Sequence, residues 1–179
     1  MKNSGKGFSL IEVMVSLVIM VIGLIGIFNL HIVAKRGSFE SFQQTQASYY
    51  ANDIISRMKL NSSQLASYGS SSGVGTQYSG TPTTPGTACT GAATCTPAQM
   101  AAWDLFEWRA AFTGQAEVVN AQNVGGLDTP TACIQVNGNN VTVVMSWRGI
   151  RSTSDSELFV GCGSANDRRR VYSIQTVII

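Results

Sequence analysis

The sequence predicts an α+β fold, in which a long N-terminal α-helix packs on a C-terminal antiparallel β-sheet. Two observations lead to this prediction. A long apolar run near the N-terminus is followed by residues whose apolar positions recur at helical spacing. The last third of the chain contains short β-rich runs and a hairpin signal. A sheet with one face to cover and an amphipathic helix bury each other's apolar surfaces, which makes the helix the natural cover.

Length and composition restrict the class of protein. The chain has 179 residues, enough for one domain or one domain with an appendage. Its formal net charge is +2, too small to argue for nucleic acid or an acidic substrate as partner. Charged residues make up 12%, about half the usual share of a soluble domain. The N-terminal apolar run and a Ser/Thr/Gly-rich middle account for this deficit.

The apolar run is long enough to cross a membrane. From Phe8 to Val33 the one charged residue is Glu12, and about 20 apolar residues suffice to span the hydrocarbon core. Residues 1–7 are short and basic, which is also how a secretory signal peptide begins. However, the run is longer than the apolar region of a signal peptide, contains a carboxylate and lacks a small-residue cleavage site. We therefore expect an uncleaved membrane-spanning helix over residues 8–34.

An amphipathic helical segment is expected to continue this helix over residues 35–60. Its apolar positions recur at helical spacing among polar residues; they are Ala47, Ala51, Ile54, Ile55 and Met58. Gly37 and Ser38 could bend the helix, and two separate helices are the alternative.

The C-terminal domain, residues 61–179, begins with a long loop over 61–96, rich in Gly, Ser and Thr, with short strands possible at its tyrosines. A helix is predicted from about 97 to 113, because Thr96, Pro97 and Gln99 form a helix start with a capping box. Its apolar face is formed by Ala101, Leu105, Trp108 and Phe112, and Trp103 and Trp108 are both interpreted as core residues.

The last part of the chain is expected to form three or four antiparallel strands. Two apolar runs flank Asn137-Gly138, a hairpin signal, and Asn139-Asn140 are expected to lengthen its loop. Glu157–Val160 and Val171–Ile179 are two further strand candidates.

The four cysteines favour disulfides in an oxidising compartment. The chain has an even number of cysteines, namely Cys89, Cys95, Cys133 and Cys162. No histidine accompanies them, since the single His31 is far away in sequence. Three pairings are possible, and we prefer the one that joins neighbours, Cys89–Cys95 and Cys133–Cys162. A zinc site of four cysteines is the alternative, but the paired C-x-x-C spacing is absent.

The basic residues flanking the apolar run are balanced, so the initiator amine and the cysteines together favour a cytoplasmic N-terminus.

No motif for catalysis, cofactor binding or metal binding is present, so we expect a protein without enzymatic activity or cofactor. Carboxylates are few and no close pair stands out. Arg168-Arg169-Arg170 is the strongest basic cluster and could contact DNA. It is more simply interpreted as a solvated loop before a strand, since acidic residues lie nearby in sequence.

Glu12 needs an explanation, because a carboxylate in a membrane helix costs roughly 2.5 to 3.5 kcal/mol on insertion scales. It could reach the lipid headgroups. A better partner appears if the chain is cut between Gly7 and Phe8, since the new α-amino group has an unperturbed pKa of about 7.7 to 8.0 and is cationic near neutral pH. Glu12 then lies one helical turn from a positive charge, or meets the amine of a neighbouring subunit.

The segment K-G-F-S-L-I-E-V, residues 6–13, resembles the N-terminal signal of type IV prepilins and pseudopilins. It has a basic leader, a glycine, a phenylalanine that becomes the mature N-terminus, and a glutamate at the fifth mature position. The resemblance implies a pilin-like fold, cleavage after Gly7 by prepilin peptidase and N-methylation of Phe8. It also implies that Glu12 guides assembly, that residues 8–34 form the fibre core, and that the C-terminal domain lies in the periplasm.

The rest of the chain resembles the PilV type of minor pilin of type IVa pili. Residues 95–108, C-T-P-A-Q-M-A-A-W-D-L-F-E-W, and 141–149, V-T-V-V-M-S-W-R-G, are similar to segments of that group. The resemblance implies a subunit of the inner membrane and then the pilus that primes assembly or sits at the tip, with roles in adhesion and twitching motility. The implied partners are the major pilin, minor pilins of the PilW, PilX, FimU and PilE types, and a tip adhesin-like protein. No nucleic-acid partner is expected.

Two other functions share parts of this pattern. A minor pseudopilin of a type II secretion system has the same leader and helix, and a DNA-uptake pilin would use Arg168 to Arg170. The long loop, the cysteines and the segment after Cys95 favour the pilus.

Overall fold

The computed structural model describes residues 7–153, 159 and 161–179. The chain divides into two compact units, Met1–Phe39 and Glu40–Ile179, which are described separately. One helix, α1 (Leu10–Leu60), contributes to both units, and Gly37 does not end it. The strand candidate Glu157–Val160 lies outside the described residues, apart from Phe159.

From Leu10 onward the N-terminal unit is a single helical segment with an exposed apolar surface. The apolar window of α1 is long enough to cross a membrane, and none of its residues is buried within the protein. Leu10, Ile19 and Leu30 are typical members of this exposed set. The unit therefore has no core of its own, as expected for a helix whose surroundings are lipid or other helices.

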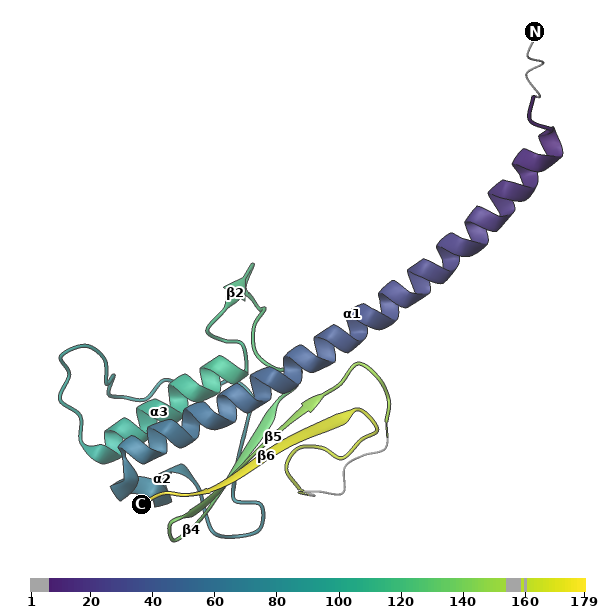
Figure 1. Ribbon diagram of the computed structural model, residues 1–179. Helices are drawn as coiled ribbons and strands as arrows, with labels where there is room; N and C mark the ends of the chain where they lie inside the picture. The colour runs from purple at the N-terminus through teal and green to yellow at the C-terminus, as the bar shows by residue number, and fades with distance from the viewer. Residues whose placement is uncertain (1–6, 154–158, 160) are drawn as a thin grey trace. The chain divides into compact units, whose positions relative to one another are not determined.

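The C-terminal unit has α and β layers (Figure 1). Its elements after α1 are η1 (Ser62–Gln64), α2 (Leu65–Tyr68), β1 (Thr76–Ser79), α3 (Pro97–Phe112), β2 (Val118–Val119), β3 (Gln122–Asn123), β4 (Thr131–Asn137), β5 (Asn140–Arg148) and β6 (Arg169–Val177). The main sheet has the order β1-β4-β5-β6 with every pair antiparallel, and β2 and β3 form a separate two-stranded sheet. The predicted α+β class with an antiparallel sheet is confirmed.

One face of the main sheet forms the core together with α1 and α3. Figure 1 shows both helices over the same face of this sheet. The five positions of α1 predicted to be apolar at helical spacing, from Ala47 to Met58, are all buried. The indole of Trp108 on α3 is fully buried, and its Nε1 donates to the backbone oxygen of Tyr50 on α1 at 2.8 Å. Alternate residues of β4 and β5, such as Ile134 and Val143, complete the core.

The start of α3 has the capping box that the sequence predicted. The backbone N–H of Gln99 donates to Thr96 Oγ1 at 3.3 Å, the backbone N–H of Thr96 donates to Gln99 Oε1 at 2.9 Å, and Pro97 occupies the first turn. The interpretation of Trp103 as a core residue was wrong. Its side chain is half-buried and donates from Nε1 to Glu107 Oε1 at 2.9 Å, because position 103 lies off the face of α3 that carries Trp108.

The hairpin between β4 and β5 is tighter than predicted. Asn137 pairs with Asn140, so the loop consists of Gly138 and Asn139 alone. Gly138 has φ +60°, the conformation that a type II′ turn requires of its first central residue. The expectation that Asn139-Asn140 lengthen the loop was therefore wrong.

The segment 61–96 carries more structure than a plain loop. It contains η1, α2 and β1, and Tyr68 of α2 is fully buried. The backbone oxygen of Ser70 accepts from Val136 N at 3.0 Å, which fixes the chain to β4. Gly75 has φ +85°, and a Cβ there would lie 2.0 Å from Ile134 O, so this close crossing needs a glycine.

Candidate assembly and processing site

The residues predicted for processing lie before the first turn of α1 and are accessible. Helical structure begins at Leu10, so Gly7 and Phe8 precede it. The Phe8 side chain is 85% exposed. A Cβ placed on Gly7 would contact nothing within 4 Å. A peptide bond in such a position can be reached by an enzyme without unfolding the helix.

Glu12 lies in the first turn of α1. Its backbone N–H donates to Ser9 O at 3.0 Å, and its backbone oxygen accepts from Ser16 Oγ at 2.8 Å. The N-terminus of a helix presents unpaired N–H groups and a partial positive charge, so a carboxylate in the first turn is stabilised there. Sequence reasoning considered the lipid headgroups and an α-amino group as partners and missed this contribution, although the position of Glu12 four residues after Phe8 could have indicated it.

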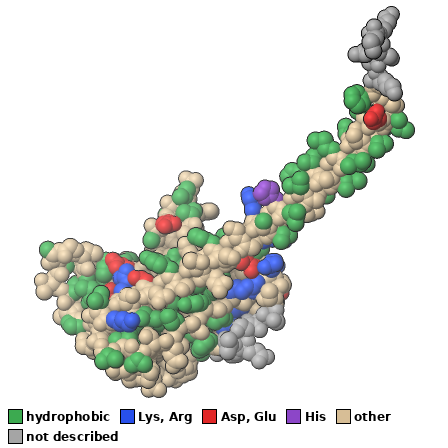
Figure 2. All heavy atoms as spheres, viewed as in Figure 1, with side chains coloured by type: hydrophobic (Ala, Val, Ile, Leu, Met, Phe, Trp, Pro, Cys, Tyr) green, Lys and Arg blue, Asp and Glu red, His purple; other side chains and the backbone are tan. Residues whose placement is uncertain are grey.

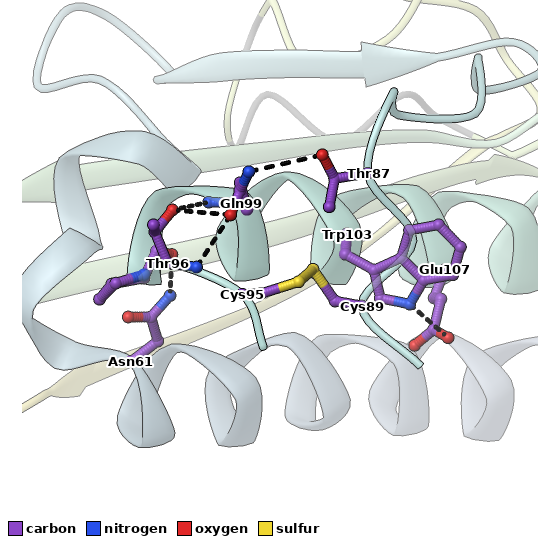
Figure 3. Close-up of a disulfide and its surroundings, with 9 residues drawn as sticks. Asn61, Thr87, Cys89, Cys95, Thr96, Gln99, Trp103 and Glu107 are labelled. Atoms are coloured by element: carbon purple, nitrogen blue, oxygen red, sulfur yellow. Dashed lines mark hydrogen bonds between the residues drawn. A yellow bond between two sulfur atoms is a disulfide. The ribbon is translucent and has the colours of Figure 1, made fainter. Parts of the chain in front are cut away.

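Both disulfides join the neighbours that the sequence favoured. Cys89 bonds to Cys95 just before α3, and Trp103 lies beside this bridge (Figure 3). Cys133 on β4 bonds to Cys162 on the sheet face away from the main core, where the two residues form a small cluster with Val144. All four cysteines are therefore used, and none remains for a zinc site.

A charged network that the sequence did not reveal joins α1 to α3. Arg57 forms salt bridges from Nε to Asp53 at 3.2 Å and from Nη1 to Asp104 at 3.3 Å and Glu107 at 2.8 Å. Tyr68 Oη donates to Asp104 Oδ2 at 2.6 Å. Asp53 is one helical turn from Arg57, but Asp104 and Glu107 are 47 and 50 residues away, so spacing alone could not bring these two to it. The expectation that no carboxylates lie close together was wrong, because Asp104 and Glu107 share one guanidinium.

The pKa shifts in this network follow from burial and hydrogen bonding. Burial raises the pKa of the Tyr68 phenol, and its hydrogen bond to Asp104 raises it further. Burial acts to lower the pKa of Arg57, but the hydrogen bond to Glu107 and the charge of Asp53 outweigh this and raise it. The groups are mutually satisfied, and among the described residues no cluster of three metal-binding side chains occurs. The network therefore connects α1 with α2 and α3.

The triple arginine is not a solvated patch. Arg168 is exposed, but Arg169 is 4% exposed and donates from Nε and Nη2 to Cys162 O at 3.2 and 3.1 Å. Arg170 is half-buried, and its Nη2 lies 3.5 Å from the Glu40 carboxylate. The solvated-loop interpretation thus holds for Arg168 and was wrong for the other two, whose side chains fix the chain around β6.

Glu40 links α1 to the segment after β5. Its carboxylate accepts from Arg151 N at 3.1 Å and pairs with the guanidinium groups of Arg151 and Arg170. Burial acts to raise the pKa of Glu40, but the backbone hydrogen bond of Arg151 and the charges of Arg170 and Arg151 together lower it.

Comparison with known families gives two matches that agree with this geometry. A family model described as the prokaryotic N-terminal methylation motif matches residues 2–28, which contain the processing residues and Glu12. A model described as type IV pilin Tt1218 matches residues 30–106, which include the amphipathic part of α1 and the first turns of α3. No curated protein matches the chain. No solved structure matches it either.

Proposed function

Because the chain belongs to the type IV pilin superfamily, we propose that it is a minor pilin of the PilV type, which takes part in priming, assembly or tip structure of type IV pili. The observation that carries this proposal is the methylation motif at the head of an exposed, apolar helix. The role is structural rather than catalytic. The C-terminal unit is then the part of the subunit that contacts other proteins.

Processing removes residues 1–7 as the leader. Prepilin peptidase cleaves after Gly7 and methylates the new amine of Phe8. The open space around Gly7 supports this proposal, since no described residue lies within 4 Å of a Cβ placed there. Residues 8–34 then anchor the subunit in the inner membrane and later enter the fibre core, while residues 35–179 stay in the periplasm and reach the cell surface on the pilus.

Glu12 acts as the docking group in assembly. Its carboxylate meets the amine of Phe8 on an adjacent pilin, and this pairing removes two charges from an apolar core where each alone would be costly. The first-turn position of Glu12 supports the proposal, because the side chain starts beside the end of the helix where an N-terminal amine would be. The partners are the major pilin and minor pilins of the PilW, PilX, FimU and PilE types, with a tip adhesin-like protein.

Intact mass and N-terminal sequencing test the processing step, on membrane protein from cells with and without prepilin peptidase. We expect a chain that begins at methylated Phe8 only when the peptidase is present. A chain that begins at Met1 in both strains contradicts the proposal. Gly7→Val should block cleavage, and because the structure leaves room for a side chain at this position, the block would report recognition by the peptidase rather than misfolding.

Glu12→Ala tests the docking role. We expect normal cleavage at Gly7 and a strong loss of the subunit from sheared pili, with Glu12→Gln behaving in the same way because it also lacks the charge. Normal incorporation of both variants would exclude charge pairing.

The phenotype of a deletion strain separates the pilus from a type II secretion system. Loss of surface pili and twitching with normal protein secretion supports the minor pilin, whereas the reverse pattern supports a minor pseudopilin. A DNA-uptake role finds little support, since Arg169 and Arg170 are engaged within the fold. Replacing Arg168 by Ala should leave DNA binding unchanged.

A further inference from the structure

The C-terminal unit carries a cluster of exposed apolar side chains, here named the valine patch. It combines an aromatic pair on α1 with aliphatic residues of the β2–β3 hairpin. Its members and their exposed fractions are Phe42 (54%), Tyr49 (67%), Val119 (56%) and Val124 (59%), of which the two valines lie on the same face of the hairpin. Figure 2 shows hydrophobic side chains over the hairpin.

Tyr49 of the patch and the base of the hairpin line a single cavity. Phe42 and Tyr49 are seven residues apart, about two helical turns, and therefore share one face of α1. A cavity of about 270 Å³ is lined by Tyr49 on α1 and by Glu117 and Gly125 at the base of the hairpin. The hairpin thus stands beside the helix face that carries the aromatic pair.

Specific interactions hold the hairpin in this position. The two strands pair through Val118 with Asn123, and Val124 N donates to Glu117 O at 2.9 Å. Below the hairpin, Gln43 of α1 donates from Nε2 to Gly126 O at 3.3 Å and accepts from Asp128 N at 3.0 Å.

The hairpin turn is the two-residue type in which both central residues have positive φ, +51° at Asn120 and +61° at Ala121. Alanine rarely adopts this conformation. This turn connects β2 directly to β3 and fixes the register in which Val119 pairs with Gln122.

The charge around the patch indicates which surface it fits. Glu117 is exposed and makes no ion pair among the described residues. Residues 114–128 contain no Lys or Arg. An anionic membrane surface attracts apolar segments flanked by basic residues, so this segment is poorly suited to lipid. A symmetric contact with a second copy would bring two copies of segment 114–128 together, and this segment offers no cation to pair with Glu117.

We propose that the valine patch is the docking surface for a different subunit of the pilin superfamily. That subunit covers the valines and Tyr49 with apolar side chains and places one Lys or Arg against Glu117. This inference rests on the proposed function, because the partner is a pilin. It goes further by assigning the contact to the hairpin and α1 face of the C-terminal unit rather than to the N-terminal helix.

Photo-crosslinking in living cells tests the proposal on the full chain. A photoreactive phenylalanine analogue replaces Val119, and the crosslinked product is identified by mass spectrometry. We expect a product with a protein that carries its own prepilin motif. The same analogue at Gln77, which is exposed on the sheet face away from the main core, should give at least fivefold less of this product. Crosslinks to lipid, to a second copy of this chain or to no protein overturn the proposal.

Two variants separate the apolar contact from the charge, with the crosslink placed at Val124. Val119→Ser and Glu117→Gln should each lower the yield several-fold, and the yield of the unaltered protein should fall as salt is raised. Val177→Ser is the matched control, because Val177 is 55% exposed on β6, outside the patch. Equal yields for Val119→Ser and Val177→Ser overturn the proposal.

The failure of this inference can be told apart from failure of the proposed function. If Glu12→Ala prevents incorporation into pili while Val119→Ser leaves both crosslink and incorporation intact, the chain is a pilin and the valine patch is not its docking surface. If Phe8 is never processed, the proposed function fails whatever the crosslinks show.

Discussion

Removal of one hydroxyl group, by Tyr68→Phe, tests whether the Arg57 network stabilises the C-terminal unit. Tyr68 is fully buried, and its Oη donates to the carboxylate of Asp104 at 2.6 Å and accepts from Asn61 Nδ2 at 3.2 Å. The substitution keeps the ring and its packing. It leaves a buried carboxylate with one donor fewer, although Arg57 still contacts Asp104 at 3.3 Å.

The expected loss follows from the charge of the acceptor. A hydrogen bond to a charged group contributes about 1.5 to 3 kcal/mol, against about 0.5 to 1.5 kcal/mol for a neutral pair. We expect Tyr68→Phe to lower the free energy of unfolding by about 2 kcal/mol, because the remaining contact with Arg57 limits the cost. With a urea slope of about 2 kcal/mol per molar, the unfolding midpoint falls by about 1 M.

Urea unfolding of the purified full chain in detergent, with both disulfides intact, measures this loss through tryptophan fluorescence. Tyr50→Phe is the matched control, since Tyr50 is also buried but its Oη donates to the neutral amide oxygen of Gln46 at 3.0 Å. It should cost about 1 kcal/mol. If Tyr68→Phe proves no more destabilising than Tyr50→Phe, the network is not a source of stability.

Three further predictions concern β6, β1 and the disulfides. Arg169→Ala should lower the unfolding free energy by about 2 kcal/mol or more, because it removes buried hydrogen bonds to Cys162 O, whereas Arg168→Ala should stay within about 0.5 kcal/mol. Burial raises the pKa of Tyr78 to about 12 from the ordinary phenol value of 10.0, although the positive charge of Arg109 opposes the shift. The neutral phenol therefore stabilises the fold below about pH 10, and this contribution is lost as pH rises towards 12. Urea midpoints across this window should fall less steeply in Tyr78→Phe, and an unchanged slope would contradict the assignment. The disulfides close loops of unequal length, with separations of 29 residues at Cys133 and 6 at Cys89. Chain entropy predicts losses of roughly 3.6 and roughly 2.4 kcal/mol when each is replaced by serines, and the reverse order in urea unfolding would argue against that account.

Features set by neighbouring residues could be predicted from the sequence. The start of α3 is an example, since Thr96, Pro97 and Gln99 act within one turn and need no distant partner. The same holds for the buried face of α1, where helical spacing alone identifies residues from Ala47 to Met58. The N-terminal methylation motif over residues 2–28 is equally local.

Features that depend on distant partners could not be predicted. Tyr68 and Asp104 are 36 residues apart, and nothing in the sequence around either residue indicates that α2 and α3 bring them into hydrogen-bond contact. Arg169 appeared solvated because its neighbours are charged, and only the fold shows that it lies against the Cys162 carbonyl. The β2–β3 hairpin has no strand pattern longer than two residues, so its exposed valines gave no signal.

The distribution of buried residues makes the assembly experiments interpretable. The first buried residue of α1 is Gln43, so none of the described residues before it is buried. Gly7, Phe8 and Glu12 are all exposed. Variants at these positions should therefore leave the urea midpoint of the C-terminal unit unchanged. If Glu12→Ala loses assembly with an unchanged midpoint, the loss is one of contact between subunits, whereas a lowered midpoint would mean that the N-terminal helix stabilises the domain and that the docking role of Glu12 has not been isolated.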